Sequence, residues 1–258
     1  MKKYNRAHCG GPVSTKKYDY SKTDVSPYRL PKGTGLQQFI SDLNGEGQIR
    51  FYYIRSVKWD NNKAGLYQFG CGLNLKSRLA TLSTCKRDML QTIYKHWDDE
   101  TKPLYIGVLG TTEGRKLNSE TPLLFLGKVD QVFYSFDDMW DKLPPKIRAS
   151  KDVRKHPLGD MYPPNFKKSS FANKHVHSIN GIYRKDLKYS CPLVFKQWRA
   201  WPDADIVFKE NKSIAKASEK FKRMIKKPAQ MRHGWVYSLA EVKPVLRPIL
   251  KSLAKGEL

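Results

Sequence analysis

Several stretches of residues 49–208 have the hydrophobic pattern of β-strands. The stretch that begins at Ile49, IRFYYIRSVKW, alternates and is rich in aromatic and β-branched residues, which is typical of a strand. KPLYIGVLGTT and TPLLFLGKVDQVFYS are apolar runs on either side of a polar loop, so they predict a hairpin of buried strands. CPLVFKQW and ADIVF predict further strands. We therefore expect a core domain over residues 49–208.

Two predicted helices lie between these strands. The first follows KSRLATLSTCK, with Ser83 or Thr84 as its cap, and its apolar residues are spaced for burial on one face. These apolar residues are Met89, Leu90 and Ile93. The second is SFDDMWDKL, where Ser135 precedes acidic residues, as is typical of a helix N-terminus.

Residues 209–258 are predicted to form a basic helical region. One face of its first helix carries cations three or four residues apart: Lys209, Lys212, Lys216, Lys220, Arg223 and Lys227. The other face is apolar: Ala217, Phe221, Met224 and Ile225. Because the cationic stripe contains no glutamate, it differs from an ordinary solvated lysine face and indicates an anionic partner. The last segment opens with a capping-box pattern from Ser238 to Glu241, but Pro244 and Pro248 predict a kink or a restart.

Glycine and proline interrupt the pattern in two other regions. Residues 1–48 are rich in lysine and show no sustained period, so they predict a basic N-terminal arm, with an untethered tail as the alternative. In residues 144–190, prolines and glycines interrupt every candidate helix. We therefore expect a long loop there, and a long loop inside a compact domain is often functional.

The charge balance indicates the class of partner. The 258 residues include 48 Lys and Arg against 24 Asp and Glu, so the net charge is +24. Hydrophobic residues make up 40% and aromatic residues 12%, which is too much for a disordered chain. The surplus charge therefore lies mostly on a folded body, and we expect a polyanionic partner, DNA in the first place with RNA as the alternative.

Location and redox state follow from what the sequence lacks. No run of about 18 apolar residues occurs, and the N-terminus MKKYNRAHCGG has no apolar signal-peptide stretch. We therefore expect a protein of the cytoplasm or nucleoid with no membrane partner. The four cysteines lie far apart without a CxxC pair, so neither a zinc ribbon nor a disulfide framework is predicted.

Several motifs together resemble a phage and bacterial family called nucleotide modification associated domain 2. In chain order they are TLSTCK (81 to 86), YIGVLGTT (105 to 112), LLFLGKVDQVFYSFDDMW (123 to 140), RKHPLGDMYP (154 to 163), HVHS (175 to 178), PLVFKQW (192 to 198) and RHGW (232 to 235). The resemblance covers roughly residues 50–235 and implies a role around modified DNA bases. The chain departs from the family pattern at residues 102–104, where KPL replaces Gly-Asp-Trp. The family's paired histidines stand here as His175 and His177.

The strands that run into GTT and then LLFLGKV also look like the core of the PUA, ASCH and EVE group of small β-barrels. That group holds a nucleotide or a modified base in a cleft. The resemblance implies an α+β fold with a PUA/EVE-like mixed β-barrel core, peripheral helices and a functional loop over residues 144–190.

Four residues are candidates for catalysis. Cys85 lies beside a lysine near a predicted helix start, where a thiolate is stabilised, although a small buried hydrophobe is the alternative. Asp160 follows Gly159, which lets the backbone approach closely, and it either orients a base edge or a histidine or forms an Asx-turn. His175 and His177 suit phosphate contacts or acid-base catalysis. We expect no metal site, because no third ligand is evident near the two histidines.

Further residues are candidates for nucleic-acid contacts. Arg154 and Lys155 precede the GDMY turn and suit phosphate capture, as does Lys86. Tyr162 either stacks on a base or packs internally. Arg232 and His233 suit backbone contacts, with a loop anchored by the following tryptophan as the alternative reading. The six tryptophans offer stacking surface, although most tryptophans are core residues.

These observations lead to two hypotheses. The first is a DNA-binding protein of the base-modification class that holds a flipped nucleotide in a barrel cleft, either to modify it or to recognise a modified base. The second is a non-catalytic phage or mobile-element protein that binds DNA, RNA or a host nucleoprotein through charge. No zinc deaminase signature, P-loop or GxGxxG motif occurs. The sequence assigns no cofactor, target base or oligomeric state.

Overall fold

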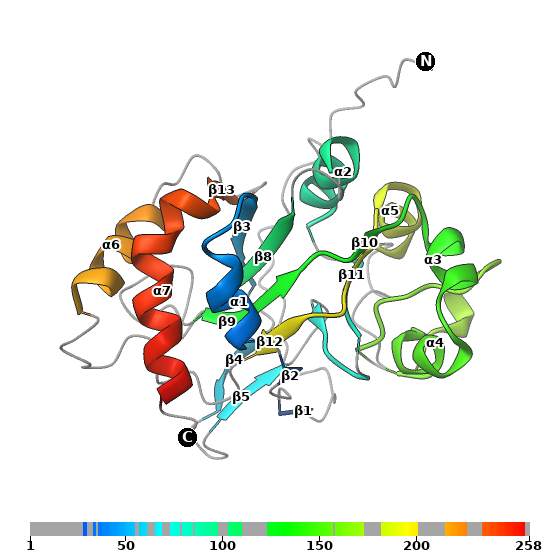
Figure 1. Ribbon diagram of the computed structural model, residues 1–258. Coiled ribbons are helices and arrows are strands. Elements are labelled where there is room, and N and C mark those ends of the chain that lie inside the picture. The colour runs from blue at the N-terminus through cyan, green and yellow to red at the C-terminus, as the bar shows by residue number, and fades with distance from the viewer. Residues whose placement is uncertain are drawn as a thin grey trace.

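The protein has an α+β fold, as the sequence predicts (Figure 1). In this computed structural model the described residues are 28–29, 33–34, 36–54, 57–60, 65–68, 73–77, 79–84, 86–97, 103–109, 123–156, 158–172, 182–200, 215–225 and 234–255. The predicted strand ADIVF, at residues 204–208, lies outside them.

The largest sheet has six strands in the order β13-β3-β8-β9-β12-β2. Their bounds are Trp235–Ser238 (β13), Gln48–Tyr53 (β3), Leu104–Leu109 (β8), Leu123–Lys128 (β9), Trp198–Ala200 (β12) and Gly33–Thr34 (β2). The predicted hairpin is confirmed by the antiparallel pairing of β8 with β9, while β3 and β8 are parallel. The described strands form a linear order with β13 and β2 at its edges, so the expected closed barrel is not confirmed.

Two smaller sheets accompany it. The four-stranded sheet has the order β10-β11-β7-β6 and positions the polar cluster described below. Its strands are Gln131–Val132 (β10), Leu193–Phe195 (β11), Ala80–Leu82 (β7) and Leu73–Asn74 (β6). The three-stranded sheet has the order β1-β5-β4, with bounds Tyr28–Arg29 (β1), Gly65–Gln68 (β5) and Val57–Asp60 (β4).

Three helices pack on one face of the six-stranded sheet (Figure 1). They are Leu36–Asp42 (α1), Ala215–Ile225 (α6) and Leu239–Lys255 (α7). Phe39 of α1 packs edge-on against Tyr105 of β8, with 6.0 Å between the ring centroids. Phe221 of α6 packs against Phe51 of β3 in the same way, with 5.1 Å between the ring centroids. Because α1 is anchored by buried apolar residues, the prediction that residues 1–48 form only an arm was wrong for its last part.

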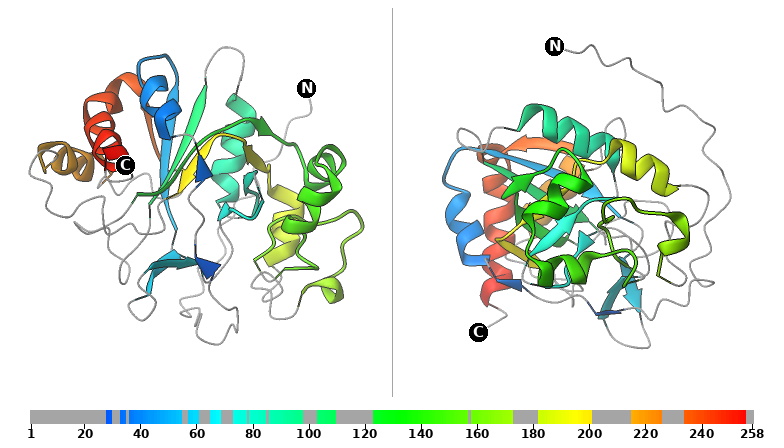
Figure 2. Two further views of the ribbon diagram at one scale, coloured as in Figure 1. Left: turned by 60° about the horizontal axis from the view of Figure 1, so that its bottom comes forward. Right: turned by 90° about the vertical axis from the view of Figure 1, so that its right-hand side faces the viewer.

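The remaining helices lie at the other side of the molecule (Figures 1 and 2). They are Arg87–His96 (α2), Phe136–Lys142 (α3), Pro145–Lys151 (α4) and Ile182–Tyr189 (α5), with a 3-10 turn at Lys168–Ser170. The predicted loop 144–190 is therefore helical at both ends. Pro144 and Pro145 do not prevent α4, because they occupy its cap and first position, where no backbone N–H is needed.

The predicted N-terminal cap is confirmed for α3 and wrong for α2. Ser135 caps α3 as predicted, accepting a hydrogen bond from the backbone N–H of Asp138 at 3.2 Å. For α2 the prediction was wrong: neither Ser83 nor Thr84 is the cap, and Lys86 holds that position in a left-handed conformation with φ of 61°. Both side chains are buried.

Helix α7 runs through both of its prolines as one continuous helix, so the predicted restart does not occur. An internal proline costs about 3 kcal/mol in helix propensity. Burial of a large aliphatic side chain returns about 1.5–3 kcal/mol, and five such residues on one side of α7 are fully buried. These residues are Val242, Val245, Leu246, Ile249 and Leu250. The predicted reciprocal cap between Ser238 and Glu241 starts this helix.

Candidate functional site

The described residues include only part of the predicted sites. Among the catalytic candidates, Asp160 is described, whereas Cys85, His175 and His177 lie outside the described residues. The nucleic-acid candidates outside them are Lys209, Lys212, Lys227, Arg232 and His233.

Asp160 lies in a polar cluster inside the protein. Its side chain is 0% exposed, and the Thr81 hydroxyl donates to its two carboxylate oxygens at 3.0 and 2.8 Å. Burial raises the pKa of Asp160, whereas the charge of Lys151 and hydrogen bonds from Thr81, Ser83 and Asn74 lower it. Three of these partners come from or directly after the small strands β6 and β7.

Lys151, the last residue of α4, completes this cluster. It is 0% exposed, and its ammonium Nζ donates to the backbone oxygen of Asn74 at 2.6 Å and to Oδ1 of the same residue at 3.1 Å. Burial lowers the pKa of Lys151 to about 7, although the charge of Asp160 acts in the opposite direction. We call Asn74, Thr81, Ser83, Lys151 and Asp160 the buried lysine-aspartate cluster.

A second polar pair borders this cluster. The Nδ1 atom of His156 accepts a hydrogen bond from the backbone N–H of Leu158 at 3.0 Å, so the neutral ring carries its proton on Nε2. Nε2 contacts Nζ of Lys76, and this contact is a hydrogen bond only if the lysine amine is neutral. Burial lowers the pKa of Lys76. Burial and the nearby lysine charge lower the pKa of His156 to about 4.

The cluster attaches the chain segment 151–161 to the four-stranded sheet. The backbone N–H groups of Asp160 and Met161 both donate to the carbonyl of Lys151, at 2.9 and 3.0 Å, and close the segment on itself. The expected close approach at Gly159 is confirmed, because a Cβ there would lie 2.7 Å from the backbone of Asp152 and Val153. Asp160 does not reach solvent and its described hydrogen bonds are internal, so these contacts hold the segment in place. Its catalytic role stays a prediction.

Three other predicted contacts lie on the same segment. Tyr162 is 0% exposed, and its hydroxyl donates to the buried carboxylate of Asp186 at 3.1 Å. It therefore packs internally in this structure, which is the second of the two predicted alternatives, and a contact with nucleic acid stays a prediction. Arg154 is exposed, but its guanidinium binds the carboxylate of Asp152 through two nitrogens, which offsets its charge. Lys155 is exposed and forms no ion pair with a described residue.

The other side of the molecule carries a surface of unpaired cations. On α6, the predicted stripe residues Lys216, Lys220 and Arg223 are exposed, and Phe221 and Ile225 are buried on the opposite face, as predicted. Helix α7 adds a second row: Lys243, Arg247 and Lys251. None of these six side chains forms an ion pair with a described residue. We call these six residues the basic helical surface.

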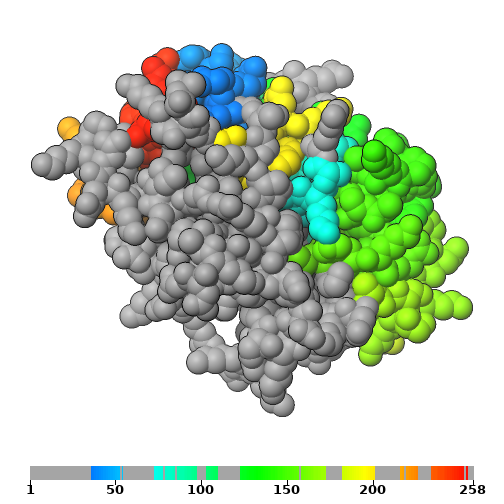
Figure 3. All heavy atoms as spheres, turned by 90° about the horizontal axis from the view of Figure 1, so that it is seen from below, coloured from blue at the N-terminus to red at the C-terminus, as the bar shows by residue number. Residues whose placement is uncertain are grey.

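The acidic side chains on these two helices are engaged elsewhere. Glu219 binds Lys222 at 2.8 Å, and Glu241 accepts from the backbone N–H of Ser238 at 2.7 Å. Figure 3 shows that α6 and α7 (orange and red) lie on one side and residues 123–172 (green) on the other. The basic helical surface is therefore well separated from the segment that holds Asp160.

Among the described residues, two tyrosines have exposed aromatic rings, and no sequence motif distinguishes them. Trp198 and Trp235 are buried, as most tryptophans are expected to be. Tyr94 on α2 and Tyr134 before α3 are 41% and 58% exposed, and their ring centroids lie 5.7 Å apart. They come together because α2 and the segment before α3 are neighbours in space, which no local sequence signal reveals.

No protein-family profile, curated protein or solved structure matches the chain. The resemblance to nucleotide modification associated domain 2 therefore stays a prediction.

The described residues contain no group of three His, Cys, Asp or Glu side chains that could hold a metal ion. The thiol of Cys191 is buried, and burial raises its pKa to about 11, so it is a poor nucleophile. None of the helices in the described part of the chain has the length and apolarity needed to cross a membrane.

Proposed function

We propose that the protein binds nucleic acid, DNA in the first place, through the basic helical surface. The observation that carries this proposal is a row of three exposed cations on α6, Lys216, Lys220 and Arg223, which form no ion pair with a described residue. A protein that neutralises phosphates releases condensed counterions, so exposed unpaired cations favour such a partner. The net charge of +24 supports the same partner.

We further propose that this binding serves the modification of DNA bases or the recognition of a modified base. This further proposal rests on the family resemblance, which predicts a PUA/EVE-like cleft for a flipped nucleotide. The exposed ring pair of Tyr94 and Tyr134 supports it, since unpaired bases stack on exposed aromatic side chains. Cys85, Asp160, His175 and His177 remain the proposed groups for chemistry, and the described contacts of Asp160 hold its segment in place.

Salt-dependent DNA binding tests the first proposal. We expect the logarithm of affinity to fall linearly with the logarithm of salt concentration. Replacing Lys216, Lys220 and Arg223 together by Gln should make the slope shallower by about 2–3, because each lost phosphate contact contributes about 0.9. The charge-matched control replaces Lys146, Lys167 and Lys168, which are exposed on the opposite side. Equal effects of both triple variants, or no binding to DNA and RNA in dilute buffer, would refute the proposal.

Nucleoside mass spectrometry separates an enzyme from a reader. Cells with and without the gene should differ in their modified nucleosides if the protein modifies bases. Cys85→Ala should then abolish the modification while DNA affinity stays nearly intact, whereas a reader should lose affinity instead. An unchanged nucleoside profile would leave charge-driven binding to DNA or RNA as the function.

A further inference from the structure

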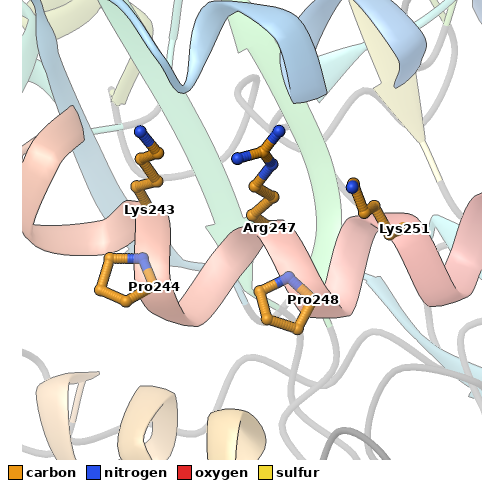
Figure 4. A pocket seen from close by; sticks show the side chains of 5 residues that line it. All are labelled: Lys243, Pro244, Arg247, Pro248 and Lys251. Atoms are coloured by element: carbon orange, nitrogen blue, oxygen red, sulfur yellow. The ribbon is translucent and has the colours of Figure 1, made fainter.

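A hollow of about 570 Å³ runs along the outer side of α7 and belongs to none of the predicted sites. The described residues that line it all come from this helix: Lys243, Pro244, Arg247, Pro248 and Lys251. Figure 4 shows the three basic side chains extending from one flank of the helix in the same direction, with the two proline rings on the other flank. We call this hollow the α7 groove.

The spacing of its cations fits an extended polyanion. Lys243, Arg247 and Lys251 are four residues apart, so each step advances about 6 Å along the helix axis. The strand of a duplex winds around the duplex axis, so its phosphates leave a straight row after a few nucleotides. A straight row of cations therefore suits a strand that is free to extend along it.

The prolines supply the apolar side of the groove. Pro244 is exposed and Pro248 half-buried, and the two rings lie one helical turn apart, in step with the cations. A proline has no backbone N–H, so its ring presents only C–H groups to a ligand. Sites for single-stranded nucleic acid combine a cationic groove with flat apolar surfaces for the bases. The α7 groove has both parts, with the cations on one flank of the helix and the proline rings on the other.

The electrostatics of the groove also favour an anion. Arg247 forms no ion pair with a described residue, and its Nε atom has no hydrogen-bond partner. The one acidic residue of α7, Glu241, is held by the backbone N–H and hydroxyl of Ser238 at 2.7 and 2.8 Å. No described carboxylate therefore neutralises the cationic row.

We propose that the α7 groove binds an unpaired, extended segment of a nucleic-acid strand. The cations contact successive phosphates, and the proline rings contact the sugar or base faces. This inference rests on the proposed nucleic-acid binding and deepens it, because it names an unpaired strand as the ligand. DNA and RNA share the phosphate chain that the groove recognises.

The test compares single strands with a duplex. Affinities for oligothymidylate, oligouridylate and a DNA duplex, each about twelve nucleotides long, are measured by fluorescence anisotropy across salt concentrations. Replacing Lys243, Arg247 and Lys251 together by Gln should weaken single-strand binding about tenfold or more and make its salt slope shallower by about 2. Duplex affinity should change much less. If the variant loses more affinity for oligothymidylate, the ligand of the groove is DNA. If it loses more affinity for oligouridylate, the ligand is RNA.

Two further variants make the test specific. The charge-matched triple variant at Lys146, Lys167 and Lys168 should keep single-strand affinity. Pro244→Ala with Pro248→Ala should weaken single-strand binding about twofold to threefold without changing its salt slope, while helix α7 becomes more stable.

The outcomes separate this inference from the proposed function. If the wild-type protein binds neither DNA nor RNA, the proposed function fails and the inference fails with it. If the wild-type protein binds but the α7 triple variant matches the charge-matched control, or weakens duplex and single strand equally, only the α7 groove is refuted. Equal competition by polyglutamate would also overturn it, since any polyanion would then suffice.

Discussion

The hydroxyl of Thr81 should be a main stabilising contact of the buried carboxylate of Asp160. Thr81→Val keeps the shape of the side chain but removes the donor to both carboxylate oxygens, at 3.0 and 2.8 Å. A hydrogen bond to a charged group contributes about 1.5–3 kcal/mol. Each kcal/mol shifts the melting temperature of a protein of this size by about 2–4 °C. We therefore expect Thr81→Val to lower it by about 3–12 °C.

Thr81→Ser is the matched control, because it keeps the hydroxyl and removes one methyl group. The lost methyl group costs about 1 kcal/mol, so this variant should melt above Thr81→Val. Burial raises the pKa of Asp160, and loss of the donor raises it further. A carboxyl group whose pKa is raised by folding destabilises the folded state as the pH rises through that pKa. The loss of stability caused by Thr81→Val should therefore grow from acidic to neutral pH.

Differential scanning calorimetry or thermal scanning fluorescence at several pH values measures both effects. If Thr81→Val melts at or above the temperature of Thr81→Ser at neutral pH, the hydroxyl does not stabilise the carboxylate. The assignment of a structural role to the buried lysine-aspartate cluster would then be wrong.

Three other variants test contacts elsewhere. The pKa of His156 is lowered from 6.5 to about 4, so the unfolded chain gains a proton first on acidification. The free energy of unfolding should therefore fall by about 1 kcal/mol, after allowance for solvent screening, as the pH drops from 6.5 to about 4. His156→Gln should make this fall smaller, as measured by urea denaturation at several pH values. Tyr162→Phe should lower stability by about 1.5 kcal/mol in urea denaturation with unchanged DNA affinity, and a loss of affinity would support Tyr162 as a contact. Glu241→Ala should destabilise α7 by about 1 kcal/mol, and an unchanged melting temperature would argue against the cap.

Features set by neighbouring residues could be predicted from the sequence. The cap of Ser135 and the reciprocal cap of Ser238 and Glu241 each join groups three residues apart, so the pattern of residue types was sufficient. The burial of Phe221 and Ile225 on α6 likewise followed from helical spacing. The antiparallel hairpin of β8 and β9 was predictable because two continuous apolar runs flank one polar loop.

Features set by distant residues could not be predicted. Lys151 and its partner Asn74 are 77 positions apart, and Asp160 and Thr81 are 79 apart. No local pattern shows that these polar side chains meet inside the protein. The α7 groove was missed for another reason: its prolines were interpreted as helix breakers, whereas burial on the opposite side of α7 keeps the helix continuous.

The described cations therefore have two different physical roles, and this difference can be measured. Lys151 is buried beside Asp160, so its replacement by Met should change the melting temperature but leave the salt dependence of DNA binding unaltered. The six residues of the basic helical surface have no described ion-pair partners, so their replacement by Gln should change the salt dependence with little effect on melting. Because the two groups lie on separate helices and on opposite sides of the molecule, their effects should add. A combined variant that departs from additivity would show that ligand binding and the internal polar cluster are coupled.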